Sequence, residues 1–149
     1  MHLGFVLAGL VLVAGCASSA TDAPPTEATT IGGTCPAEVS AAAAATIRAQ
    51  QTAFASGDFA KARRYASAGF QSVIEVPQFE EIIVMRYGFL LDDPNLEFLT
   101  CDLVDEQARM SVRVAVSPER MMTYRLVREG ADWRIDGATT PSEPSAITT

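Results

Sequence analysis

Histidine is nearly absent from this sequence: the only one is His2, ahead of an apolar run. Because histidine is the side chain that most readily changes charge near neutral pH, acid–base chemistry in the rest of the chain would fall on carboxylates or tyrosines. The sequence also lacks a glycine-rich phosphate loop, a Gly-x-Ser-x-Gly elbow and paired cysteines or histidines at metal-binding spacing. We therefore expect no cofactor and no metal.

Basic residues are scarce as well. The chain has 11 Lys and Arg against 18 Asp and Glu, a net charge of −7. A chain with this balance does not attract the phosphate backbone of nucleic acids and gains nothing from anionic lipid headgroups. Nucleic acid is therefore excluded as a partner.

One apolar run, residues 3–13, is too short to span a bilayer but has the length of the hydrophobic part of an export signal. It leads into Val13, Ala14, Gly15 and Cys16, which resemble the lipobox of bacterial lipoproteins. A plain secretory signal or an uncleaved anchor is the alternative, and no Lys or Arg precedes the run. The resemblance implies that Cys16 is lipidated. The protein would then be exported and anchored by its lipid, either on the outer side of the cytoplasmic membrane or on a periplasmic face.

Two segments are rich in Ser, Thr, Pro and Gly, and they bury too little apolar surface to fold. They flank about 105 residues, enough for one small domain. The predicted division is a signal over residues 1–15, a lipidated flexible tether over 16–34, one domain over 35–140 and a disordered tail over 141–149.

The first half of the domain shows helical spacing. Apolar residues recur about every 3.6 positions between Pro36 and Gly57, which predicts a long first helix. Asp58 is placed to cap a second, short helix over residues 59–66, and Pro77 opens a third. The connections around the third helix are predicted at residues 70–76, as an irregular stretch, and at residues 92–95.

From Leu96 the apolar residues alternate with polar ones, as in half-buried strands. Short connections imply antiparallel neighbours, and helices followed by such a sheet predict an α+β domain. We expect the N-terminal helices to pack on one face of a curved, four-stranded antiparallel sheet. The predicted strands cover residues 96–105, 110–117, 121–128 and 133–138.

Two sequence motifs resemble those of a known superfamily: Gly-Asp-Phe-Ala-Lys-Ala at residues 57–62 and Trp-Arg-Ile-Asp-Gly at residues 133–137. With the helix order they resemble the nuclear-transport-factor-2-like (cystatin-like) superfamily, whose fold is a cone of helices and curved sheet. Residues 47–53 and 79–87, with the same ending, are similar to the bacterial domain-of-unknown-function family 4864. The resemblance covers most of residues 37–138. It bears on the fold and hardly on the function.

The superfamily includes isomerases, hydrolases and cyclases that use an Asp or His base facing a Tyr or acid in the cone. No such dyad is recognisable here, and we assign no catalytic residue. Asp136 is expected to face solvent or a partner, and Tyr87 to be a core residue with a satisfied hydroxyl. The candidate acid–base residues are Tyr65, Tyr87, Tyr124, Asp102 and Asp136, and the candidate pocket residues are Tyr65, Phe79, Tyr87 and Tyr124.

Adjacent charges offer weaker candidates. Acidic neighbours on a helix point apart and acidic pairs on a loop are solvated, so surface charge is favoured over a calcium site. Surface charge is likewise favoured over anion binding for the basic residues. The acidic pairs are Glu80 with Glu81 and Asp92 with Asp93, and the basic residues are Arg63, Arg64 and Arg86.

If Cys16 carries lipid, Cys35 and Cys101 remain as an even pair. An oxidising, exported setting favours a disulfide between them, which would fasten the start of the first helix to the first strand. The alternative is two free thiols, with Cys101 buried.

Three functions remain open. The first is a non-catalytic envelope lipoprotein that binds a small apolar ligand or a protein partner. The second is an isomerase- or hydrolase-like enzyme that uses Asp and Tyr in the cone, and the third is a structural module that dimerises through the exposed sheet.

Overall fold

The structure is a computed structural model and describes residues 30–141. Its first half is helical and its second half is a sheet, as the change of periodicity predicts. In chain order the elements are α1 Ala37–Ala55, α2 Phe59–Arg63, α3 Ala68–Val73, α4 Val76–Tyr87, the 3₁₀ helix η1 Gly88–Leu90, β1 Leu96–Val104, β2 Gln107–Val114, β3 Arg120–Glu129 and β4 Asp132–Thr139.

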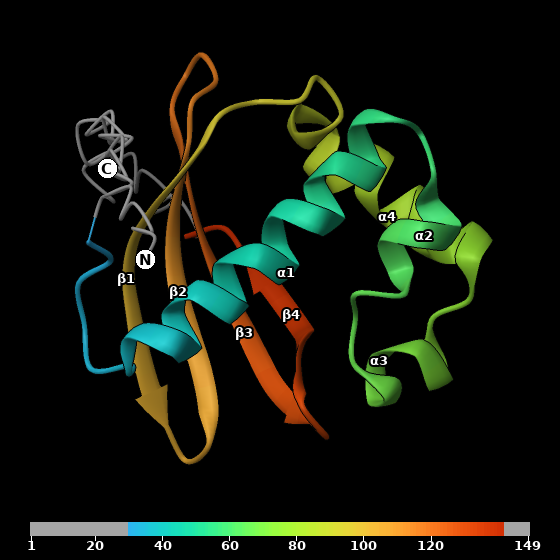
Figure 1. Cartoon of the computed structure of the whole chain (residues 1–149). Coiled ribbons are helices and arrows are strands. Elements are labelled where there is room, and N and C mark those ends of the chain that lie inside the picture. The colour runs from blue at the N-terminus through green and yellow to red at the C-terminus, as the bar shows by residue number, and fades with distance from the viewer. Residues whose placement is uncertain (1–29, 142–149) are drawn as a thin grey trace, which may run out of the picture.

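The four strands form one antiparallel sheet in the order β1-β2-β3-β4. Each strand pairs with the next along the chain, because the connections are too short for a crossover. α1 crosses one face of the sheet, and α2, α3 and α4 gather beside β4 (Figure 1). The predicted α+β domain with a four-stranded antiparallel sheet is confirmed.

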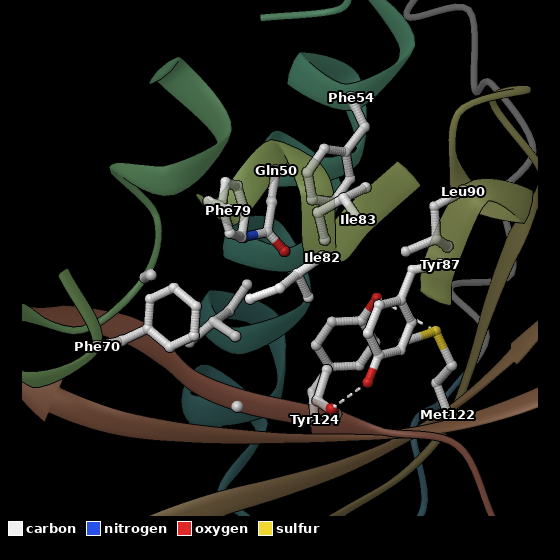
Figure 2. A pocket seen from close by; sticks show the side chains of 14 residues that line it. Gln50, Phe54, Phe70, Phe79, Ile82, Ile83, Tyr87, Leu90, Met122 and Tyr124 are labelled. Carbon is white, nitrogen blue, oxygen red and sulfur yellow. Dashed lines mark hydrogen bonds between the residues drawn. The ribbon is translucent and has the colours of Figure 1, made fainter. Parts of the chain in front are cut away.

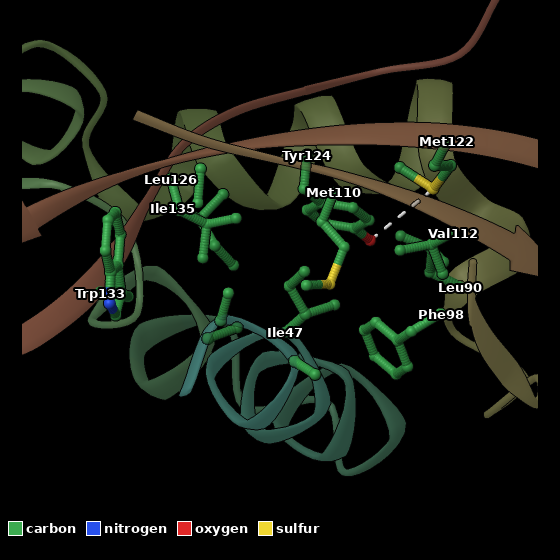
Figure 3. Close-up of a cluster of buried hydrophobic side chains, with 14 of the residues drawn as sticks. Ile47, Leu90, Phe98, Met110, Val112, Met122, Tyr124, Leu126, Trp133 and Ile135 are labelled. Atoms are coloured by element: carbon green, nitrogen blue, oxygen red, sulfur yellow. Dashed lines mark hydrogen bonds between the residues drawn. The ribbon is translucent and has the colours of Figure 1, made fainter. Parts of the chain in front are cut away.

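The hydrophobic core lies between α1 and the covered face of the sheet (Figure 3). Every second residue of β2 from Ala108 to Val114 is buried, because alternate strand side chains point to the same face. Ile47 lies on the facing side of α1, where Ala43 and Ala44 let the helix approach the sheet closely. Burying a side chain as large as Ile47 contributes about 1.5–3 kcal/mol.

The opposite face of the sheet is polar. The pairing register aligns Thr100, Ser111 and Thr123 across β1, β2 and β3. Beside this row an exposed ion pair joins Arg113 to Glu97 at 2.7 Å. One apolar and one polar face explain why β2 and β3 alternate so regularly in sequence.

The prediction of an irregular stretch over residues 70–76 is wrong, because these residues contain most of α3 and the start of α4. The Ser67 hydroxyl caps α3 by accepting from the Phe70 backbone N–H at 3.1 Å. At the other end the Arg63 guanidinium donates to the carbonyls of Gln71 and Ile74. The second predicted helix also runs three residues too far, since α2 ends at Arg63. A helix as short as α3 depends on these contacts rather than on its own propensity.

The hairpin between β1 and β2 lies earlier than predicted. β2 begins at Gln107 rather than at residue 110, and only Asp105 and Glu106 connect the two strands. Both connecting residues have positive φ, 50° and 63°, as in the tight hairpin turns that usually contain glycine. No glycine marks this turn, so the sequence gives no turn signal there.

Backbone hydrogen bonds hold residues ahead of α1 against β1. Gly32 forms a parallel bridge with Thr100, and its N–H donates to the Leu99 carbonyl at 2.9 Å. Cys35 forms a disulfide with Cys101, so the predicted bridge is confirmed. The predicted tether extends to residue 34, but the structure places its last residues at the edge of the sheet.

The predicted signal, Cys16, most of the tether and nearly all of the tail lie outside the described residues. Within residues 30–141, no helix combines the length and the apolar character needed to cross a membrane.

Candidate functional site

A cavity of about 210 Å³ lies between α4 and the sheet, on the β4 side of the core (Figure 2). Its walls come from α1, α3, α4 and the last two strands. Phe79, Ile82, Ile83 and Tyr87 contribute the α4 wall, because these positions share one face of a helix. Most of the lining is apolar, and an apolar cavity with few polar groups is typical of a small-molecule site.

Aromatic contacts hold the helical side of the cavity together. Phe79 lies 5.9 Å from Phe54 of α1 between ring centroids, and 5.8 Å from Phe70 of α3 with the rings nearly perpendicular. Edge-to-face pairs of this kind contribute about 0.5–1.5 kcal/mol beyond burial. They attach the short α3 to the wall of the cavity.

Tyr124 is the most deeply buried polar residue of the lining, with 2% of its surface exposed. Its hydroxyl donates to the Met122 sulfur at 3.7 Å, and a thioether is a weak acceptor. Burial raises the pKa of Tyr124 far above its ordinary value, and the proximity of Tyr87 raises it further. The phenol is therefore a neutral donor at any physiological pH.

Gln50 and Tyr87 supply the other polar groups. The Tyr87 hydroxyl donates to the Ala138 carbonyl at 3.0 Å, and the Gln50 Nε2 donates to the Ala62 carbonyl at 3.2 Å. Figure 2 shows the Gln50 amide oxygen turned toward Ile82 and the cavity. Nothing among the described residues donates to this oxygen, which leaves it as an acceptor for a ligand.

The cavity is accessible from one side. Residues toward its interior, such as Phe54 and Ile83, are buried, whereas Phe70, Ile82 and Ala138 are only partly buried. These three come from α3, α4 and β4, so the opening lies where the two helices meet the edge of the sheet.

The domain-of-unknown-function model DUF4864 matches residues 37–148 of this chain. The chain belongs to this family. No curated protein and no solved structure matches it. The cavity of this DUF4864 domain therefore has to be interpreted from its own residues.

Three of the four candidate pocket residues line the cavity of the DUF4864 domain, namely Phe79, Tyr87 and Tyr124. Tyr65 does not; it packs partly buried against the core outside the cavity lining. The Tyr87 hydroxyl has a hydrogen-bond partner, as expected for a core tyrosine. Sequence reasoning missed Gln50, although its position three residues after the buried Ile47 already indicated the inner face of α1.

The two candidate aspartates lie away from the cavity. Asp136 accepts from the Ser67 hydroxyl at 2.7 Å and pairs with Arg125 at 2.9 Å. The Ser67 hydrogen bond is the largest cause that lowers the pKa of Asp136, and the Arg125 guanidinium lowers it further against the opposing effect of burial. Asp102 accepts from the Thr34 backbone N–H at 3.1 Å. Both carboxylates therefore tie parts of the fold together.

The remaining charged candidates are dispersed. All four acidic residues of the adjacent pairs are exposed, and within residues 30–141 no three His, Cys, Asp or Glu side chains gather closely enough to hold a metal ion. Arg63 caps the end of α3, while the Arg64 carbonyl accepts from Arg134. Neither feature extends the cavity site.

Proposed function

We propose that this domain is a non-catalytic binding module that holds a small apolar ligand, attached to the cell envelope through a lipid on Cys16. The observation that carries the proposal is the cavity behind α4, with its apolar lining and three inward-facing polar groups, Gln50, Tyr87 and Tyr124. A few polar groups in an apolar cavity orient a ligand, while the apolar surface supplies the free energy of binding.

The position of the cavity agrees with the proposed cone of the nuclear-transport-factor-2-like superfamily, which places its pocket between the helices and the sheet. It also agrees with membrane attachment. The chain enters the domain beside β1, whereas the cavity opens at β4, about 14 Å away across three strand spacings. An anchor ahead of residue 30 would leave the opening free.

The enzymatic alternative needs a carboxylate facing the tyrosines. The lining of the cavity holds no Asp or Glu, and Asp102 and Asp136 are both engaged by other groups. The dimer alternative would bury the exposed face of the sheet, where Arg113 pairs with Glu97 and Arg125 with Asp136, and burying such ion pairs costs desolvation. No observation favours either alternative over ligand binding.

Native mass spectrometry of the full chain, exported and gently purified, tests ligand binding. We expect a retained small molecule that is lost in Ile82→Trp, because a bulkier side chain from α4 fills the opening. Val84→Trp is the matched control, since Val84 lies two residues along the same helix, exposed and outside the lining. A bare chain, or equal retention by both variants, contradicts the proposal.

Fractionation of cells tests the anchor separately. We expect the wild-type chain in the membrane fraction, labelled by radioactive palmitate, and no label on Cys16→Ser. A wild-type chain that carries no label would contradict lipid anchoring and favour a plain secretory signal or an uncleaved anchor.

A further inference from the structure

Among the described residues that line the cavity, Tyr124 has a hydroxyl without a strong acceptor. Tyr87 has a carbonyl partner at 3.0 Å, whereas Tyr124 has only the Met122 sulfur at 3.7 Å. A buried O–H that gives up its bond to water and receives a weak partner in return is costly, and a ligand with a carbonyl or hydroxyl oxygen removes that cost. The cavity therefore favours ligands that carry an acceptor.

The charge of the lining limits the ligand further. Among the described residues that line the cavity there is no Lys, Arg, Asp or Glu, and the raised pKa of Tyr124 keeps that phenol neutral. An anionic or cationic group would lose its hydration without gaining a counter-ion. A charged fatty acid or amine is therefore disfavoured, and a neutral molecule is favoured.

The volume sets the size. A dry cavity of about 150 Å³ holds benzene, so about 210 Å³ corresponds to a ligand of roughly eight to ten non-hydrogen atoms. Drug-sized ligands occupy about 300–1,000 Å³. Polycyclic molecules and long acyl chains would extend beyond the enclosed volume.

We propose that the ligand is a neutral, single-ring or similarly compact molecule whose oxygen accepts a hydrogen bond from Tyr124. This inference rests on the proposed binding function and adds the chemical class of the ligand. Gln50 presents its free amide oxygen to any donor that the ligand carries.

Three isosteric probes test the inference: acetophenone, which has a carbonyl acceptor; α-methylstyrene, in which a methylene replaces that oxygen; and benzoate, which is anionic. Each has nine non-hydrogen atoms, which matches about 210 Å³. Dissociation constants come from NMR titration of the ¹⁵N-labelled full chain. Tyr124→Phe removes the hydroxyl and keeps the ring. Tyr65→Phe removes a hydroxyl outside the cavity lining and serves as the matched control.

We expect Tyr124→Phe to weaken acetophenone binding about tenfold and to change α-methylstyrene binding less than twofold, as lost hydrogen bonding requires. Tyr65→Phe should change neither, and benzoate should bind at least tenfold more weakly than acetophenone. If all three probes bind but Tyr124→Phe affects acetophenone and α-methylstyrene equally, or benzoate binds best, the chemical class is wrong while ligand binding stands. If no probe binds, this inference fails, and the retained molecule in native mass spectrometry decides the binding function separately.

Discussion

Gly33 is the residue whose replacement should damage the fold most for the smallest change in side chain. Its φ is +103°, a conformation that residues with a Cβ rarely adopt. A Cβ at this position would lie 2.2 Å from the carbonyl oxygen of Cys101 and 2.8 Å from its carbonyl carbon. Because both atoms belong to the backbone of β1, no rotamer change relieves the clash in Gly33→Ala.

The expected magnitude follows from these contacts. Forcing alanine into a sparsely populated backbone region costs about 1–3 kcal/mol. If the segment instead moves away, it loses the two hydrogen bonds between Gly32 and the β1 backbone, at 2.8 and 2.9 Å, each contributing about 0.5–1.5 kcal/mol. The disulfide at Cys35 limits such movement. We therefore expect Gly33→Ala to lower the free energy of unfolding by about 1–3 kcal/mol.

Urea unfolding followed by circular dichroism measures this loss, and the melting temperature should fall with it. Gly32→Ala is the matched control, because its Cβ would meet the Leu99 carbonyl at an ordinary 3.5 Å. We expect that variant to stay within about 0.5 kcal/mol of the wild type. Equal stability of Gly33→Ala and Gly32→Ala would refute the argument that the edge of β1 requires glycine at residue 33.

Three further predictions concern stability. Replacing both Cys35 and Cys101 by alanine opens a loop of 66 residues. On the chain-entropy model this should lower the free energy of unfolding by about 4 kcal/mol relative to the oxidised wild type. A wild-type chain whose stability does not change when its disulfide is reduced would contradict this prediction. Glu106→Gly should raise the free energy of unfolding by about 0.5–1 kcal/mol, because glycine adopts a φ of 63° without strain. The urea midpoint should rise accordingly, and a lowered midpoint would contradict the positive-φ turn. Asp136 has a lowered pKa when folded, so its stabilising effect is present above about pH 4 and is lost as pH falls further. The stability difference between wild type and Asp136→Asn should therefore shrink in acid, and a difference that grows in acid would show that the sign is wrong.

Local patterns predicted the elements of this fold well where side chains alternate or recur strongly. The run of buried and exposed residues in β2 and β3 defines strands by itself, because one face meets α1 and the other meets water. Two of the places where the prediction failed have a common cause. α3 exists because Ser67 caps it and Arg63 holds its last carbonyls, and the turn at Asp105 is closed by strand pairing rather than by a glycine.

The candidate site was predictable only in part. Helical spacing along α4 predicts the inward positions of Phe79 and Tyr87, because the apolar face of a helix is buried against the rest of the domain. Tyr65 does not line the cavity, because it follows the end of α2 at Arg63 and packs against the core elsewhere. Gln50 was overlooked because a single polar residue on an apolar face looks the same in sequence whether it is satisfied or free.

The sequence by itself determined that a helical half precedes the strands, the antiparallel meander and the cysteine pair available for a disulfide. All three depend on interactions between residues near in sequence or on the count of one residue type. Only the tertiary structure decided that a cavity remains between α4 and the sheet, and that Tyr124 lines it with the Met122 sulfur as its acceptor. Cavities and weakly paired hydroxyls depend on how elements distant in sequence pack together, and the periodicity of side chains within one element does not predict that packing.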